Sequence, residues 1–320
     1  MKITKDMIHP ELRLSASFIK FFMPSFKVGT LKLVKQMSQT IKGKCFSKLY
    51  YEEKYIKRSD GSLLRLAMYA PLVRKPNKVG LLWMHGGGYG LGIPEMNEKL
   101  YKMLIDETDC VIIAPDYTLS IEKPYPAAID DCYLALEWMK ANANLYMINP
   151  NQLMIGGESA GGGLTAALSL LARDRGDIEI AFQMPLYPML DDRMVTESAK
   201  FNNDPVWNSS SNYLAWKLYL GELFETEDVP IYAAPARALH YKNLPPTLTY
   251  VGSIEAFRDE TISYVEKLRL AGVHVEFQIF DGGYHAFDIL SSRTSIGIKA
   301  LEFLLINFKY ATQHYFKENK

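Results

Sequence analysis

The chain has few cysteines and no recognisable metal-binding cluster. Cys45, Cys110 and Cys132 are the three cysteines among 320 residues, and no two of them form a CxxC pair. Cys110 and Cys132 lie in apolar segments, so we expect them to be buried small hydrophobic side chains. Because no disulfide framework is indicated, we expect a reducing, cytoplasmic location. Cysteine and histidine residues are nowhere spaced as metal ligands, so no metal is expected.

An excess of one charge is also absent. Lys and Arg number 36, as do Asp and Glu, which gives a formal net charge of zero. This balance argues against a general nucleic-acid-binding protein. The charges are unevenly distributed, because residues 1–50 carry ten basic and two acidic side chains. The first fifty residues are therefore about +8 and the remainder about −8.

The sequence has no apolar run of about 18 residues, so no transmembrane helix is expected. Residues 11–23 show helical spacing, with Leu14, Phe18, Phe21 and Phe22 on one face. Such a face suits either a helix packed against the rest of its own protein or, with the nearby lysines, a helix at a membrane surface. We favour packing and keep weak membrane contact as the alternative.

Strand-like and helix-like segments alternate from residue 47 onward. The strand-like segments are 48–56, 63–70, 79–85, 110–117, 152–157, 180–188, 247–252 and 273–280. Four of them are short apolar runs bounded by turn residues, as expected of strands buried on both faces of a sheet. Helical spacing separates them, most clearly in 127–140. The pattern predicts an α/β protein with about eight mostly parallel strands and helices on both faces. The strand at 273–280 could also pair two copies in a homodimer, which the sequence leaves open.

One serine stands among five glycines in "GGESAGGG", residues 156–163, between a predicted strand and a predicted helix. Gly157 and Gly161 lie two residues to either side of Ser159, which matches the G-x-S-x-G pattern of a nucleophile elbow. Such a turn lifts the serine hydroxyl clear of the backbone at a helix N-terminus, where negative charge is favoured. Ser159 is therefore the candidate nucleophile.

A second glycine cluster, "HGGG" at residues 85–88, directly follows another predicted buried strand. Successive glycines let main-chain N–H groups converge without obstruction, as an oxyanion hole requires. A phosphate-binding loop is disfavoured, because the G-x-G-x-x-G spacing and the Walker lysine are missing. We expect His85 to orient this loop and not to act as the base.

A serine nucleophile after such a strand needs an acid and then a histidine further along the chain. His274 alternates with polar residues on a predicted strand face, and His314 lies in a polar C-terminal tail. Three more histidines come too early in the chain: His9, His85 and His240. His285 follows the last predicted strand, in the loop "DGGYHAF", and is the candidate base.

The candidate acids follow the predicted strand at 247–252: Glu255, Asp259 and Glu260. Asp259 and Glu260 fall inside a helical pattern, where acids at a helix start are commonly capping or dipole residues. Glu255 lies nearer the strand end, so it is preferred over Asp259 as the residue that orients His285.

Taken together, these motifs resemble the hormone-sensitive-lipase-like esterases of the α/β-hydrolase fold. The resemblance covers roughly residues 45–310. The matching segments are 85–88, 115–138, 157–162, 232–238, 244–252, 257–260 and 282–287. The family usually has aspartate where this chain has Glu255, so the longer carboxylate must sit slightly further back.

The resemblance implies Ser159 as nucleophile, His285 as base and the N–H groups of Gly87, Gly88 and Ala160 as the oxyanion hole. It also implies a cap made of residues 1–46 and an insertion at about 190–225, over a catalytic domain spanning 47–320. Tyr89, Tyr187 and Trp207 are candidate pocket residues. The expected activity is hydrolysis of small acyl esters through an acyl-enzyme, without a cofactor. An amidase, peptidase or deacetylase with the same triad, or a non-catalytic ligand-binding relative, remains the alternative.

Overall fold

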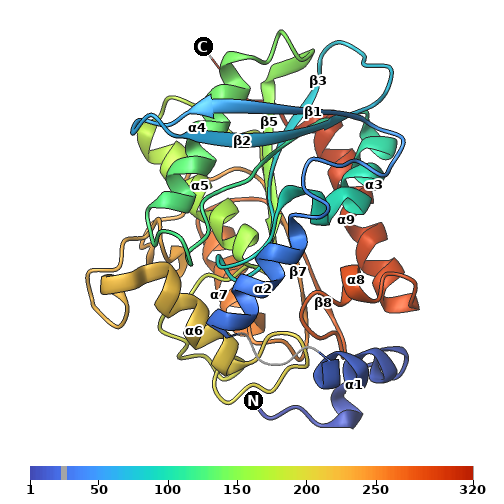
Figure 1. Cartoon of the computed structure of the whole chain (residues 1–320), viewed down its shortest axis with the longest axis vertical. Coiled ribbons are helices and arrows are strands. Elements are labelled where there is room, and N and C mark those ends of the chain that lie inside the picture. The colour runs from blue at the N-terminus through green and yellow to red at the C-terminus, as the bar shows by residue number, and fades with distance from the viewer. Residues whose placement is uncertain (23–26, 320) are drawn as a thin grey trace.

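The computed structural model describes residues 1–22 and 27–319, except for the side chain of Phe22. Its centre is an eight-stranded sheet in the order β1-β2-β4-β3-β5-β6-β7-β8 (Figure 1). The strands are β1 Tyr50–Lys57, β2 Leu63–Ala70, β3 Lys78–Met84, β4 Val111–Pro115, β5 Ile148–Glu158, β6 Phe182–Leu186, β7 Thr247–Gly252 and β8 Val275–Phe280. β2 runs antiparallel to both of its neighbours, and the remaining pairs are parallel. The expected α/β-hydrolase sheet is confirmed.

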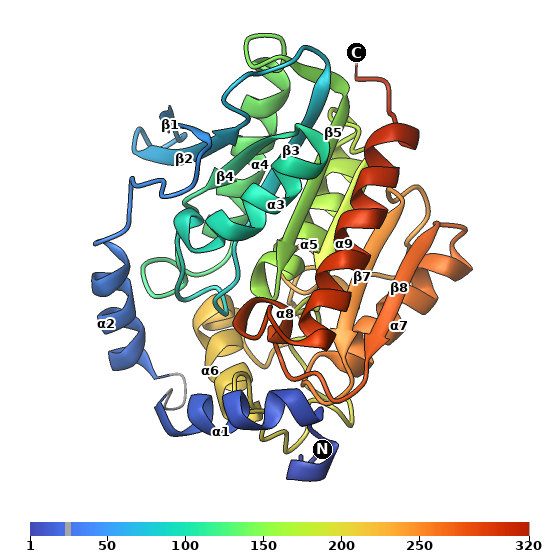
Figure 2. The ribbon, with the colours of Figure 1, turned by 90° about the vertical axis from the view of Figure 1, so that its right-hand side faces the viewer.

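Helices cover both faces of the sheet. Their bounds are α1 Arg13–Phe22, α2 Val28–Ser38, α3 Glu98–Thr108, α4 Ala127–Ala141, α5 Ala160–Arg175, α6 Ser209–Leu220, α7 Arg258–Leu270, α8 Phe287–Leu290 and α9 Ser295–His314. Figure 2 shows α3 and α9 in front of the sheet, with α4 and α5 behind it. Each side has its own apolar core, because alternate side chains of the buried strands point to opposite faces. Cys110 and Cys132 are buried and unpaired, as expected.

The parallel strands bring the candidate site residues to one edge of the sheet. Ser159 directly follows β5, and the glycines at 86–88 follow β3. Glu255 follows β7, and His285 follows β8. Because parallel strands end at the same edge, these loops converge there. α6, from the predicted insertion, and α1 lie at the same end of the molecule, at the bottom of Figure 2.

The apolar face predicted to pack in α1 is the face that the structure exposes. Leu14 is 86% exposed, Phe18 63% and Phe21 81%. The helix instead buries Ala16 and Ile19, and Leu12 of the preceding 3₁₀ turn belongs to the same apolar cluster. The helix does lie against its own protein, but the prediction of which face it buries was wrong. α1 carries apolar residues on two opposite faces, and periodicity alone does not say which one is covered. Membrane contact through the exposed face stays a prediction. Among the described helices, none has the length and apolarity to cross a bilayer.

Candidate active site

Ser159 stands at a sharp turn between β5 and α5, in a left-handed conformation with φ 58° and ψ −118°. Such a conformation is strained for a non-glycine residue, so it persists only where the surroundings impose it. The Ser159 N–H donates to Leu186 O at 3.0 Å, and its carbonyl accepts from the Gly163 and Met189 N–H groups at 2.9 and 3.0 Å. The hydroxyl is therefore presented from a rigid backbone, at the start of a helix.

Close approach explains two of the glycines around the turn. A Cβ at either Gly157 or Gly161 would overlap the carbonyl oxygen of Met84, the last residue of β3. The absence of side chains lets the start of α5 and the end of β5 lie directly against the end of β3. As a result, the serine turn and the glycine loop after β3 are fixed relative to each other by backbone contact.

The candidate base and acid form one hydrogen-bonded chain with the serine. His285 Nε2 lies 2.9 Å from Ser159 Oγ, and His285 Nδ1 lies 2.5 Å from Glu255 Oε2. The Gly252 N–H donates to Glu255 Oε1 at 2.6 Å and fixes the other carboxylate oxygen. All three side chains are buried. In this arrangement the acid orients the imidazole and the imidazole can take the serine proton.

Burial sets the protonation of this chain. It lowers the pKa of His285 to about 4, although the charges of Asp204 and Asp288 oppose the shift. It raises the pKa of Glu255 well above its usual range. At neutral pH the imidazole is therefore free to accept the proton from Ser159. With its own proton on Nδ1, the ring donates to Glu255 Oε2 and keeps Nε2 as the acceptor that faces Ser159 Oγ.

The other candidate acids lie in different contacts. Asp259 pairs with Arg258 at 2.7 Å and accepts the Ser198 N–H at 2.8 Å. Glu260 is buried and accepts the Leu190 N–H at 2.7 Å. Neither is hydrogen-bonded to His285, whose imidazole has Glu255 as its acid partner among the described residues. His274 and His314 are exposed, and their rings are hydrogen-bonded to Glu276 and to the Tyr310 carbonyl.

The glycine loop faces the serine turn. Among the described residues, the N–H groups of Gly87, Gly88 and Ala160 donate no hydrogen bond. Gly88 has φ 58°, and a Cβ there would overlap the Trp207 ring. His85 is buried and stacks on Tyr117, with 4.2 Å between ring centroids. His85 is thus part of the support of the loop and makes no hydrogen bond to the serine.

Glu158 is a contributor that sequence reasoning missed. Its buried carboxylate accepts three hydrogen bonds, from the Gly86 N–H at 2.6 Å, Asn97 Nδ2 at 2.7 Å and Trp83 Nε1 at 2.8 Å. It therefore ties the residue before the nucleophile to the beginning of the glycine loop. The only sequence signal was its place inside the G-x-S-x-G motif.

We expect Glu158→Gln to lower kcat by about 10- to 100-fold with little change in KM. The NH₂ group of the glutamine can only donate, yet it would face one of the N–H donors that Glu158 now accepts. The resulting repulsion should displace the glycine loop, whose N–H groups stabilise the transition state. Steady-state kinetics on a soluble ester measures the effect. Glu260→Gln, at another buried glutamate bonded to backbone N–H groups, is the control. An unchanged kcat in Glu158→Gln would contradict this role.

The three predicted pocket residues have different surroundings. Trp207 lies over Gly88 and has its ring centroid 6.1 Å from that of His285, so it borders the site. Tyr187 packs edge-on against His285 at 5.2 Å, and its hydroxyl donates to Asp288 Oδ2 at 3.2 Å. Tyr89 stacks on Tyr219 of α6 at 3.8 Å. Trp207 thus covers the glycine loop, Tyr89 directly follows it in the chain, and Tyr187 supports the imidazole.

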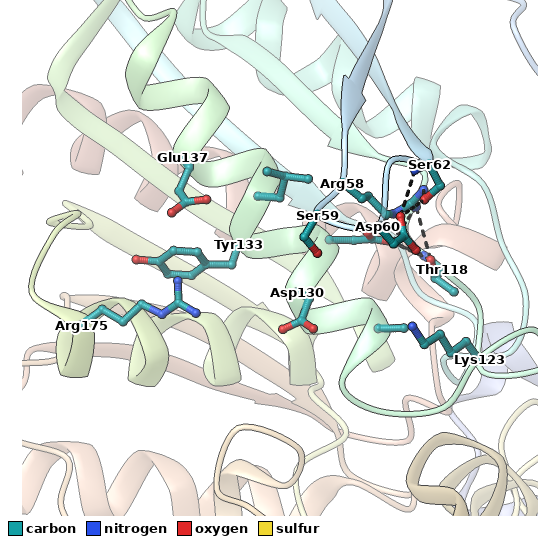
Figure 3. A pocket seen from close by; sticks show the side chains of 13 residues that line it. Arg58, Ser59, Asp60, Ser62, Thr118, Lys123, Asp130, Tyr133, Glu137 and Arg175 are labelled. Atoms are coloured by element: carbon teal, nitrogen blue, oxygen red, sulfur yellow. Dashed lines mark hydrogen bonds and ion pairs between the residues drawn. The ribbon is translucent and has the colours of Figure 1, made fainter.

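A separate polar cavity of about 400 Å³ lies between the β1–β2 turn and α4 (Figure 3). Both of its arginines are already engaged: Arg58 pairs with Asp131 at 2.5 Å, and Arg175 lies over the Tyr133 ring at 3.9 Å. The cavity is not lined by Ser159, His285 or Glu255. Among the described residues, no group of three or more histidine, cysteine or acidic side chains could hold a metal ion.

Comparison with known proteins gives consistent matches. A family model described as the alpha/beta hydrolase fold matches residues 81–289. Esterase LipI of Mycobacterium tuberculosis is 32% identical over 197 residues, which is 61% of each chain. An arylesterase of Saccharolobus solfataricus is 29% identical over 235 residues, 72% of this chain and 75% of that protein. A solved structure of a bacterial heroin esterase has a TM-score of 0.87 and 30% identity, and covers 97% of this chain and 99% of its own. The sequence match thus spans about three fifths of the LipI length.

Proposed function

Since the chain belongs to the α/β-hydrolase family and to its hormone-sensitive-lipase-like esterases, we propose that it is a serine carboxylesterase of short- to medium-chain acyl esters. The observation that carries the proposal is the hydrogen-bonded chain from Ser159 through His285 to Glu255, beside the unused N–H groups of the glycine loop. The names of the relatives, esterase and arylesterase, agree with this activity.

The reaction follows from the contacts. His285 Nε2 takes the proton of Ser159 Oγ as this oxygen bonds to the ester carbonyl carbon. The N–H groups of Gly87, Gly88 and Ala160 stabilise the oxyanion. The carbon–oxygen bond to the alcohol then breaks, and His285 returns the proton to the leaving alcohol. Water attacks the acyl-enzyme by the same steps and releases the carboxylic acid and free Ser159.

Aromatic residues of the cap support the preference for short acyl groups. Trp207 lies over Gly88, and Trp216 and Tyr219 of α6 pack on Tyr89 beside it. Because these rings are buried beside the oxyanion loop, we expect them to limit the length of the acyl chain. A long acyl group would need the cap to move.

The test is hydrolysis of p-nitrophenyl esters from acetate to palmitate, together with the matching anilides and a fluorophosphonate probe. We expect the highest kcat/KM among the short and medium esters, and probe attachment at Ser159 by peptide mass spectrometry. Faster cleavage of anilides would make the protein an amidase. The absence of both turnover and labelling would overturn the proposal and favour a non-catalytic ligand-binding relative.

A further inference from the structure

Asp204, in the insertion that covers the site, uses both carboxylate oxygens on backbone N–H groups. Oδ1 accepts from Val206 at 2.7 Å and from Trp207 at 3.0 Å. Oδ2 accepts from the N–H of His285 at 2.9 Å. The side chain is only 2% exposed, and among the described residues it forms no salt bridge. Its charge is therefore balanced by oriented N–H groups and not by a cation.

The bond to His285 fixes the catalytic histidine from a second side. The ring of His285 is held by Glu255 and Ser159, which follow strands of the sheet. Its backbone is held by Asp204, which belongs to the insertion. An aspartate that only shaped its own turn would need Oδ1 alone, as in an Asx turn. The bond of Oδ2 to a residue 81 positions away needs another explanation.

The same carboxylate also fixes the residue that covers the oxyanion loop. Trp207 donates its N–H to Asp204, and its ring lies over Gly88 and 6.1 Å from the His285 ring. When this segment is in place, one side chain thus sets both the cover of the glycine loop and the backbone of the base. When the segment moves away, both contacts are lost together.

We infer that Asp204 is a positioning residue that couples the seating of the cap insertion to the placement of the His285 imidazole. The inference rests on the proposed ester hydrolysis, because it concerns the base of that reaction. It means that the base is held in its reactive position only while the cap segment covers the site. A small misplacement of such a group can cost about 100-fold in rate.

The protonation of Asp204 gives this role a measurable signature. Burial raises the pKa of Asp204 to about 6, and burial lowers the pKa of His285 to about 4. Around this contact the other titratable groups are Glu255 and Asp288 beside the His285 ring, and His9, whose N–H donates to Gly282. As the pH falls through about 6, Asp204 gains a proton, and an O–H replaces an acceptor beside the His285 N–H. We therefore expect kcat/KM to fall near pH 6, above the pH at which His285 itself is protonated.

The test compares the wild type with Asp204→Asn, with a short ester as substrate and a fluorophosphonate as active-site probe. Asparagine keeps the shape and one acceptor oxygen, but its NH₂ would face the His285 N–H. We expect about a tenfold lower kcat on the plateau and loss of the component near pH 6. Burial also raises the pKa of Glu158 to about 7. Because Glu158 is present in both proteins, its effect on the pH profile cancels when the two profiles are compared. Asp192→Asn, at a buried aspartate that pairs with Arg237, is the control and should keep the wild-type pH profile.

The outcomes separate the two proposals. A wild type that neither hydrolyses esters nor reacts with the probe would overturn the proposed function. A reactive wild type with an Asp204→Asn variant of equal rate and unchanged pH profile would overturn the coupling alone. Should Asp204→Asn not fold, the amide proton resonance of His285 in the wild type decides. It should titrate with a midpoint near pH 6, and a resonance that is insensitive to pH in that range would refute the coupling.

Discussion

Replacing Ser159 with alanine should lower ester hydrolysis by about 10⁶-fold, close to the rate in its absence. The alanine side chain has no oxygen to form the acyl-enzyme, and nothing else in the described contacts of His285 could take its place. The rate is measured on p-nitrophenyl acetate, and covalent labelling with a fluorophosphonate should vanish with it. Fold and stability should change little, because a small side chain is replaced by a smaller one.

Ser169→Ala provides the matched control for this substitution. Ser169 is also a buried serine of the α5 region, but its hydroxyl donates to Gln183 and lies outside the site. Its variant should retain the wild-type rate. Persistent hydrolysis in Ser159→Ala, at a rate that follows the amount of protein through purification, would show that another residue is the nucleophile.

Replacing Glu255 with glutamine should lower kcat by about 10⁴-fold. The amide still accepts the Gly252 N–H, but its NH₂ group then faces His285 Nδ1 and imposes the wrong tautomer on the ring. With Nε2 protonated, the imidazole cannot take the proton of Ser159. KM should change far less, because Glu255 and Ser159 are bonded to different nitrogens of the imidazole and Glu255 does not face the substrate side.

Asp259→Asn decides between the two acids that the sequence left as alternatives. Its carboxylate pairs with Arg258 and caps the Ser198 N–H, so we expect activity within a few-fold of the wild type. A large loss in Asp259→Asn together with a small loss in Glu255→Gln would reverse the assignment. The ratio of the two effects is informative even if both variants lose some stability.

The sequence was most informative where local chemistry and strand order act together. Short apolar runs predicted the buried parallel strands of the sheet. The candidate nucleophile, base and acid were each chosen from motifs that directly follow a strand, at positions 159, 255 and 285. Because parallel strands end at the same edge of a sheet, residues that directly follow such strands are expected to lie close together. The spatial order of the strands was not predicted, since local patterns carry no information on which strands are neighbours.

Contacts made across the fold were beyond the reach of local patterns. Asp204 reads as an ordinary turn residue before a proline, and its bond to His285 spans 81 positions. Glu158 was visible only as the variable residue of a motif. In α1, Leu14 and Phe18 had the right spacing for packing, but the helix buries its opposite face. In each case the residue type was known from the sequence, but its contacts depend on segments that are distant in the chain.

The serine turn and the end of β3 are in direct backbone contact, and this contact restricts which residues can be substituted there. At Gly157 and Gly161 any side chain would collide with Met84 O, so the spacing of nucleophile and oxyanion donors has almost no room for substitution. The predicted insertion, which supplies Trp207 and α6, is a continuous stretch of chain that reaches the reacting groups through side-chain contacts, such as that of Asp204 with the His285 N–H. We therefore expect that a chimera carrying this stretch from a relative would keep the geometry of the serine turn, and would need an acceptor for the His285 N–H to keep the base in place.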